Sequence, residues 1–177
     1  MKLDSKLRNA IREIKDYPKP GIVFKDIVPI LAIPDLVSEI LDAQVLHWKN
    51  QPIDAIAGIE ARGFIFGSLL AHALKLPFIP VRKVGKLPYE RITQEYSLEY
   101  GTASIEMHTD ALQPGWNVLV HDDLLATGGT AAATGDLVNR LGGDVSGFSF
   151  LINLGFLPGK KILKERFERD PFFLVEF

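Results

Sequence analysis

Residues 118–130 constrain the fold of this chain more than any other segment. They read VLVHDDLLATGGT, an apolar run followed by two adjacent aspartates and then by small residues. The apolar run is typical of a strand buried on both faces of a parallel sheet. The small residues predict a tight turn into a helix. The segment therefore favours an α/β fold in which this strand leads directly into a loop and a helix.

The loop after the two aspartates has the chemistry of an anion site. Consecutive backbone N–H groups and two hydroxyls can converge there at the N-terminus of the following helix, whose dipole adds partial positive charge. The residues of this loop are Ala126, Thr127, Gly128, Gly129 and Thr130. No lysine follows Gly129 and the segment has no G-x-G-x-x-G string, so neither a Walker P-loop nor a Rossmann fingerprint is indicated.

Asp122 and Asp123 fall at the carboxyl end of the predicted strand. Carboxylates at that position can accept hydrogen bonds from sugar hydroxyls or hold Mg²⁺ through water. A diol site beside a phosphate site describes a pocket for ribose 5-phosphate. The alternative is a plain strand-to-helix turn with acidic residues near the helix start, but the full DDLLATGGT string favours phosphate binding.

Composition narrows the class of protein. The chain has 177 residues, of which 47% are hydrophobic, enough for one α/β domain over residues 1–177. A net charge of −2 argues against a nucleic-acid partner, and the absence of cysteine excludes disulfides and thiolate metal sites. No apolar run approaches membrane-spanning length. We therefore expect a cytoplasmic enzyme or a cytoplasmic binding protein, with no membrane partner.

Hydrophobic periodicity and turn residues predict alternating strands and helices. An N-terminal appendage, residues 1–33, precedes the main domain, and residues 83–96 are expected to form a long mobile loop. Helices are expected over residues 3–16, 63–75 and 160–167. Two more are expected, one that begins near residue 34 and one that ends near residue 141. Strands or extended segments are expected over residues 22–24, 53–59, 78–81, 97–107, 118–120, 145–153 and 172–176.

Polar side chains follow three of the predicted strands. The segments are Glu60-Ala61-Arg62, Arg82-Lys83 and Asp122-Asp123. In a parallel sheet, ligands bind outside the carboxyl ends of the strands. We therefore expect these three segments to meet at a single site.

Together these segments resemble the type I phosphoribosyltransferases, and the resemblance covers almost the whole chain. The 122–130 string is similar to that family's signature for phosphoribosyl diphosphate (PRPP), and RKVGKLP (82–88) with YSLEYG (96–101) resembles its adenine-specific members. The resemblance implies a mostly parallel central sheet flanked by helices, a small N-terminal hood and a mobile loop. It also implies transfer of ribose 5-phosphate from PRPP to N9 of adenine, which gives AMP and pyrophosphate and requires Mg²⁺, in a homodimer.

The reaction that the resemblance implies needs positive charge around the departing pyrophosphate and exclusion of water. Arg62 can donate a rigid fork to phosphate, and the Glu60-Ala61-Arg62 turn resembles the family's pyrophosphate loop. Arg82, Lys83 and Lys86 add charge on or beside the mobile loop, although a basic loop can also be merely solvated. Arg91 matches no family motif and is assigned to the surface. Mg²⁺ is expected to be held mainly by PRPP and water near Asp122 and Asp123, without assured side-chain ligation.

The assignment of the purine-binding residues depends more on the family resemblance than the assignment of the phosphate-binding residues does. Glu99 matches a residue that contacts N7 of the base and acts as a general acid/base, and we assign it, Arg62 and Lys83 catalytic roles. Taken alone, Glu99 reads as a solvent-facing strand residue. The resemblance places adenine recognition on the main chain of Val23 and Lys25, with Phe24 as a stacking surface. The alternative is a short strand that packs Val23 and Phe24 into the core.

Some positions depart from the family's pattern. His121 replaces a small or β-branched residue and is interpreted as a satisfied core histidine. Asn153 replaces a commonly acidic residue, and residues 89–92 are idiosyncratic. The alternative functions are a phosphoribosyltransferase for xanthine or for hypoxanthine and guanine, and a PRPP-sensing regulator without catalysis.

Overall fold

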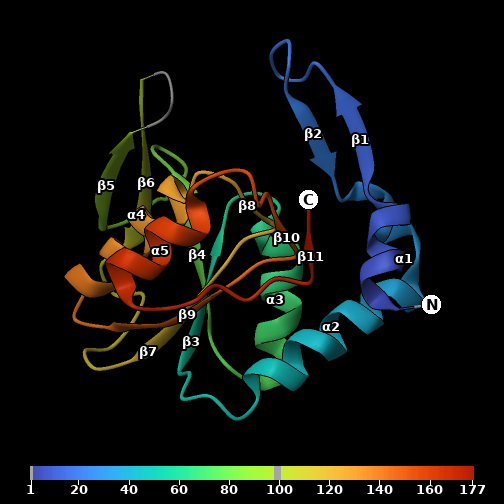
Figure 1. The fold of residues 1–177 in the computed structure, drawn as a ribbon. Helices are drawn as coiled ribbons and strands as arrows, with labels where there is room; N and C mark the ends of the chain where they lie inside the picture. The colour runs from blue at the N-terminus through green and yellow to red at the C-terminus, as the bar shows by residue number, and fades with distance from the viewer. Residues whose placement is uncertain (1, 98–100) are drawn as a thin grey trace.

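The computed structural model describes residues 2–97 and 101–177. Its central sheet contains β3 (Ala55–Ile59), β4 (Phe78–Lys83), β5 (Arg91–Ser97), β6 (Thr102–His108), β7 (Asn117–His121) and β9 (Asp144–Ser149). The strand order is β5-β6-β4-β3-β7-β9 (Figure 1). The four strands from β4 to β9 run parallel, whereas β6 is antiparallel to both β4 and β5. The predicted mostly parallel sheet is confirmed.

Helices cover both faces of this sheet. They are α2 (Pro34–Trp48) and α3 (Gly63–Leu74) on one face, and α4 (Gly129–Arg140) and α5 (Gly159–Phe167) on the other. Alternate residues of β3 divide between the faces: Ala55 and Ala57 pack with α4, and Ile56 packs with α3. All five residues of β3 are buried, as expected for a strand covered on both sides.

The N-terminal segment differs from its prediction. Helix α1 (Leu3–Ala10) ends six residues early, and the chain continues as β1 (Arg12–Lys15), which forms an antiparallel hairpin with β2 (Val23–Asp26). The apolar spacing extends through Ile11 to Ile14, which mimics a helical stripe, but Ile14 pairs with Phe24 across the hairpin. Strand pairing therefore overrides the local helical pattern. The hairpin projects from the core, and the short helix η1 (Val28–Ala32) leads back to α2 (Figure 1).

The segment 83–96 is also more regular than predicted. Strand β4 extends to Lys83 and β5 begins at Arg91, so only residues 84–90 form a turn between strands. Strand β5 is the outermost strand of the sheet, and it packs Ile92 and Tyr96 on the core while alternate residues face solvent. That alternation was missed because polar residues occupy most of the strand.

A second, three-stranded sheet joins the C-terminal strand to the 122–130 segment. Its strands are β8 (Leu124–Leu125), β10 (Ile152–Asn153) and β11 (Val175–Glu176), all parallel. The strand predicted over 145–153 is thus two strands in two sheets. The strand predicted over 172–176 is limited to β11, preceded by a single bridge between Phe172 and Ser149. Within the described residues, no helix has the length and apolar character needed to cross a membrane.

Candidate active site

Three cavities meet at the carboxyl ends of the parallel strands, around the loop between β8 and α4. The smallest, of about 80 Å³, is lined by Asp122 and by every residue from Leu124 to Ala131. It shares Asp122 and Thr130 with a cavity of about 330 Å³ that also contains Glu60 and Lys83. It shares Ala126 and Thr127 with a cavity of about 840 Å³ that reaches the β1–β2 hairpin. The three strand-end segments therefore meet, as predicted.

The loop Ala126–Thr130 is shaped by α5 as well as by its own sequence. Gly128 has a φ of 83°, a left-handed conformation that favours glycine, and its carbonyl accepts the Ala132 N–H at 2.9 Å. The Gly159 N–H donates to the Ala126 carbonyl at 3.1 Å. A Cβ on Gly128 would lie 3.0 Å from the Cα of Gly159, so glycines are required on both sides of this contact. The loop opens at the N-terminus of α4, where an anion would sit.

The two aspartates share a desolvated environment. The Asp123 N–H donates to Oδ1 of Asp122 at 2.8 Å. Burial, reinforced by the Asp123 charge, raises the pKa of Asp122 well above its ordinary value. Burial also raises the pKa of Asp123, although the nearby Arg62 charge opposes that rise. Nε of Arg62 lies 2.8 Å from Oδ2 of Asp123, an ion pair without hydrogen-bond geometry.

Two of the four cations assigned to pyrophosphate have carboxylate partners. Besides the Arg62–Asp123 pair, Arg82 contacts Glu60, with Nη2 at 3.0 Å from Oε1 and Nε at 3.3 Å from Oε2. Hydrogen bonding from Arg82 holds the pKa of Glu60 below its ordinary value. The Lys83 N–H also donates to Glu60, and Arg82 donates to the Lys86 carbonyl at 2.7 Å. The Glu60–Ala61 peptide bond in this turn is cis.

Lys83 lines the 330 Å³ cavity beside Asp122 and Thr130. The cavity therefore places a predicted cation together with one of the two aspartates and with the end of the loop. Lys86 lies in the adjoining turn, where the structure records its backbone contact with Arg82.

The 840 Å³ cavity brings together the residues predicted to bind the base. Val23, Phe24 and Lys25 line it from the hairpin, and Arg62 lines it from the core with its Cζ 4.7 Å from the centroid of the Phe24 ring. The alternative of a strand packed into the core is wrong for Val23, which is 43% exposed. Glu99 lies outside the described residues.

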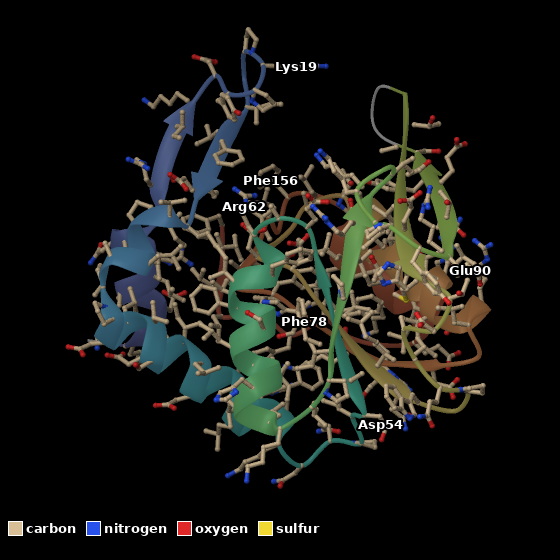
Figure 2. The ribbon with its side chains drawn as sticks, turned by 180° about the vertical axis from the view of Figure 1, so that it is seen from behind. Lys19, Asp54, Arg62, Phe78, Glu90 and Phe156 are labelled. Carbon is tan, nitrogen blue, oxygen red and sulfur yellow. The ribbon has the colours of Figure 1, made fainter. Side chains whose placement is uncertain are left out.

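The sequence reasoning missed residues from the end of the chain in this cavity. Leu154, Phe156, Leu157 and Phe177 form part of its wall. Figure 2 shows Phe156 and Arg62 near the opening between the hairpin and the core. Phe156 is 75% exposed, which is unusual for an aromatic side chain beside a cavity. An aromatic residue in an otherwise loop-like GFLPG string was the available signal.

A second missed residue is Glu106, a buried carboxylate on β6. Its Oε1 accepts from Nε of Arg91 at 2.9 Å, and its Oε2 accepts from the Gly85 N–H at 3.0 Å. Glu106 therefore ties together the two ends of the 84–90 turn, which carries Lys86. Arg91 is exposed, as expected of a surface residue, and it is also the counterion of this carboxylate.

His121 is fully buried, as expected of a core histidine, but it is not satisfied. Neither ring nitrogen has a partner at full hydrogen-bond geometry, and burial, opposed in part by the Ser149 backbone, lowers its pKa to about 3. Asn153 donates from Nδ2 to Oε2 of Glu176 at 2.6 Å, so β11 supplies a carboxylate next to it. The described residues contain no cluster of three or more histidine, aspartate or glutamate side chains able to hold a metal ion.

Comparisons with known proteins agree on one family. Residues 25–153 match the model of the phosphoribosyl transferase domain. An adenine phosphoribosyltransferase of Cytophaga hutchinsonii is 51% identical, over 89% of this chain and 87% of that protein. The crystal structure of the adenine phosphoribosyltransferase from Thermoanaerobacter pseudethanolicus has a TM-score of 0.94 and 46% identity, covering 98% of this chain and 99% of that one. The Saccharomyces cerevisiae enzyme, complexed with an imino-altritol bisphosphate and adenine, has a TM-score of 0.89 and 39% identity, covering 97% and 98%.

Proposed function

Since the chain belongs to the adenine phosphoribosyltransferase family, with the type I phosphoribosyltransferase fold, we propose how its residues perform that family's reaction. The protein is an adenine phosphoribosyltransferase: it transfers the 5-phosphoribosyl group of PRPP to N9 of adenine and releases pyrophosphate and AMP. We propose the role that each site residue plays in this reaction.

The observation that carries this assignment is the continuity of the three cavities. The small loop cavity takes the 5-phosphate, since it is surrounded by the backbone of residues 126–130 at the start of α4. The cavity with Lys83 and Glu60 takes the pyrophosphate, and the large cavity with Phe24 takes the purine. C1 of the ribose then lies between them, next to Asp122 and Asp123.

Breaking the bond from C1 to pyrophosphate leaves positive charge on the sugar and adds negative charge to the leaving group. The Asp122–Asp123 pair supports the first change, and Lys83, Arg62 and Arg82 support the second. Arg82 forms an ion pair with Glu60, and Arg62 forms one with Asp123. When PRPP binds, the two guanidinium groups must therefore interact with phosphate oxygens as well as with these carboxylates.

Magnesium fits this site as an ion that enters with PRPP. Asp122 and Asp123 offer oxygen ligands of the type that Mg²⁺ prefers. Two carboxylates would fill only part of the coordination shell of the ion, so phosphate oxygens of the substrate would have to complete it. When bound, Mg²⁺ neutralises charge on the pyrophosphate.

On the base side, main-chain groups of Val23 and Lys25 form hydrogen bonds with the edge of adenine. The Phe24 ring stacks on the adenine ring, and the Arg62 guanidinium lies over the Phe24 ring. As N9 attacks C1, the Glu99 carboxylate accepts the proton from N7 of the base, and it returns that proton in the reverse reaction. The proposal also includes a single catalytic domain over residues 1–177 that works as a homodimer in the cytoplasm. Sedimentation velocity tests the dimer, and cell fractionation tests the location.

The decisive experiment incubates the protein with PRPP and Mg²⁺ together with adenine, hypoxanthine, guanine or xanthine in turn. Nucleoside monophosphate is measured by chromatography. We expect AMP from adenine and far slower reaction with the other bases. Faster product from another purine would favour the alternative base specificity, and specific DNA binding with no AMP formation would favour a PRPP-sensing regulator.

A further inference from the structure

Phe177, the last residue of the chain, contacts the hairpin that carries the base-reading strand. The ammonium Nζ of Lys25 lies 3.8 Å from the centroid of its ring, and Cζ of Arg8 lies 5.0 Å from it. A cation within about 6 Å of an aromatic face is attracted by the ring quadrupole, most strongly where the cation is desolvated. The Lys25 side chain is only 10% exposed, so its ammonium is largely desolvated and its attraction to the ring is strong.

The position of the Phe177 ring is set by the core. The Phe177 N–H donates to the Asn153 carbonyl at 2.9 Å, and its carbonyl accepts the Gly155 N–H at 2.9 Å. Strand β11, just before it, pairs with β10, which pairs with β8. Strand β8 leads directly into the Ala126–Thr130 loop. The ring is therefore fixed relative to the proposed phosphate site.

Lys25 is held from the other side by the hairpin. Its ammonium forms an ion pair with Glu13 of β1, and the two residues are also register partners across the hairpin. Lys25 thus links a cross-strand ion pair to an aromatic ring of the core. A movement of the hairpin away from the core would break the contact of the ammonium with Phe177.

A reciprocal contact joins the same two parts of the molecule. Arg62 comes from the core and lies over Phe24 of the hairpin, whereas Lys25 comes from the hairpin and lies over Phe177 of the core. All four residues line the 840 Å³ cavity. The two contacts therefore set the width of the cavity in which the purine is proposed to bind.

We propose that Phe177 is a positioning residue for purine binding: it anchors Lys25, and with it the main chain of β2, at a fixed distance from the Ala126–Thr130 loop. The inference rests on the proposed function, because it concerns the base half of that site. Phe177 acts through Lys25 and takes no part in PRPP binding or in the bond-breaking step.

The test compares Phe177→Leu, Phe177→Tyr and wild type by steady-state kinetics with adenine and PRPP varied separately. Loss of the ring in Phe177→Leu is expected to raise the KM for adenine about tenfold, with the KM for PRPP and kcat within about twofold of wild type. Phe177→Tyr keeps the ring face and is expected to restore the wild-type KM. The matched control is Phe173→Leu, because Phe173 lies on the same segment and also carries a lysine over its ring, Lys160 at 5.5 Å, but does not line the cavity.

A purely structural role would lower the unfolding midpoint without separating the two KM values. Equal adenine KM values for Phe177→Leu and wild type, or parallel changes in both substrates, would overturn the inference. Should Phe177→Leu fail to fold, Lys25→Met tests the same contact from the other partner, since it retains the aliphatic stem and removes only the ammonium. An unchanged adenine KM in that variant would also overturn it. Absence of AMP formation by wild type would instead contradict the proposed function itself.

Discussion

At the scale of single residues, His121 is a neutral base enclosed by the central sheet and α3. Its Cδ2 lies 3.1 Å from the position that a Cβ of Gly67 would take, so the ring fits closely against the helix. Because burial desolvates the charged form of the ring, and the Ser149 backbone offsets this only in part, protonation inside the fold is strongly disfavoured. The histidine therefore affects how stability depends on pH, and it carries no proton in the reaction at neutral pH.

The pKa of His121 is about 3 in the folded state, against 6.5 for an unperturbed histidine. Between these values the unfolded chain binds a proton that the folded chain does not, so stability falls as the pH drops below about 6.5. The slope from this residue approaches about 1.4 kcal/mol per pH unit. Urea unfolding of wild type and His121→Val from pH 7.5 to 4.5 measures it as the difference between the two proteins.

The valine variant is also expected to be at least as stable as wild type at pH 7.5, because it removes two buried unpaired nitrogens. Its advantage should then widen steadily as the pH falls. Two stability profiles that stay parallel across the range would contradict the assignment of a depressed pKa to His121.

Glu99 gives a second prediction at this scale. Replacing it with glutamine keeps the shape but removes the carboxylate that accepts the proton, so turnover is expected to fall about 10²- to 10⁴-fold. PRPP binding, measured by calorimetry, should change little, because Glu99 is assigned to the base. Glu95→Gln, at an exposed position of β5, is the control. Near-normal turnover of Glu99→Gln would remove Glu99 from the mechanism.

At the scale of elements, the contact of α5 with the Ala126–Thr130 loop constrains the shape of the proposed phosphate site. A Cβ on Gly159 would lie 2.3 Å from the Ala126 carbonyl oxygen and 2.8 Å from Cδ1 of Leu125. The leucine is buried in the core, and the Ala126 carbonyl accepts the Gly159 N–H, so the added Cβ would force the loop and the helix apart. The first residue of α5 therefore limits the conformation of the loop that is proposed to bind phosphate.

Gly159→Ala is accordingly expected to cost about 1–3 kcal/mol of stability through overpacking. It should also weaken PRPP binding, because the displaced Ala126 carbonyl shifts the N–H groups that follow it. Thermal unfolding and PRPP titration measure the two effects. Lys161→Ala, at an exposed position of the same helix, should change neither. A Gly159→Ala protein with unchanged PRPP affinity would mean that the loop is shaped independently of α5.

The same scale shows why two segments were misread. The apolar spacing of residues 11–14 is compatible with a helix, but residues 12–15 form a strand because residues 23–26 are available to pair with them. Residues 91–97 look irregular in sequence, yet they pair along their whole length with β6. In both cases the deciding interaction is with a partner strand, which a local pattern does not contain.

At the scale of the whole molecule, the proposed substrate would contact three segments that are far apart in the sequence. PRPP is proposed to contact the Glu60 turn, the Lys83 region and the Ala126–Thr130 loop together, and so to favour the folded state by mass action. At 100 times its Kd, PRPP with Mg²⁺ is expected to add about 2.7 kcal/mol to the free energy of unfolding. Thermal unfolding with and without PRPP measures this.

Omitting Mg²⁺ and adding a chelator should reduce that stabilisation, since the phosphates would then meet Asp122 and Asp123 without an intervening cation. The chelator alone should leave the unfolding midpoint of the ligand-free protein unchanged. Equal stabilisation by PRPP with and without Mg²⁺ would contradict the proposal that the metal enters with the substrate.

The sequence by itself determined the parts of this protein whose chemistry is local. The VLVHDDLLATGGT segment specifies a strand, an acidic pair and an anion loop through the conformations of consecutive residues, and the strand-end segments converge because parallel strands end at one edge. Tertiary structure alone decided the partners: Arg82 with Glu60, Arg91 with Glu106, and Lys25 with Phe177. The last pair joins residues from nearly opposite ends of the chain. Two-residue strands such as β8, β10 and β11 have no period to read, and an ion pair or ring contact between distant segments depends on a topology that no local pattern encodes.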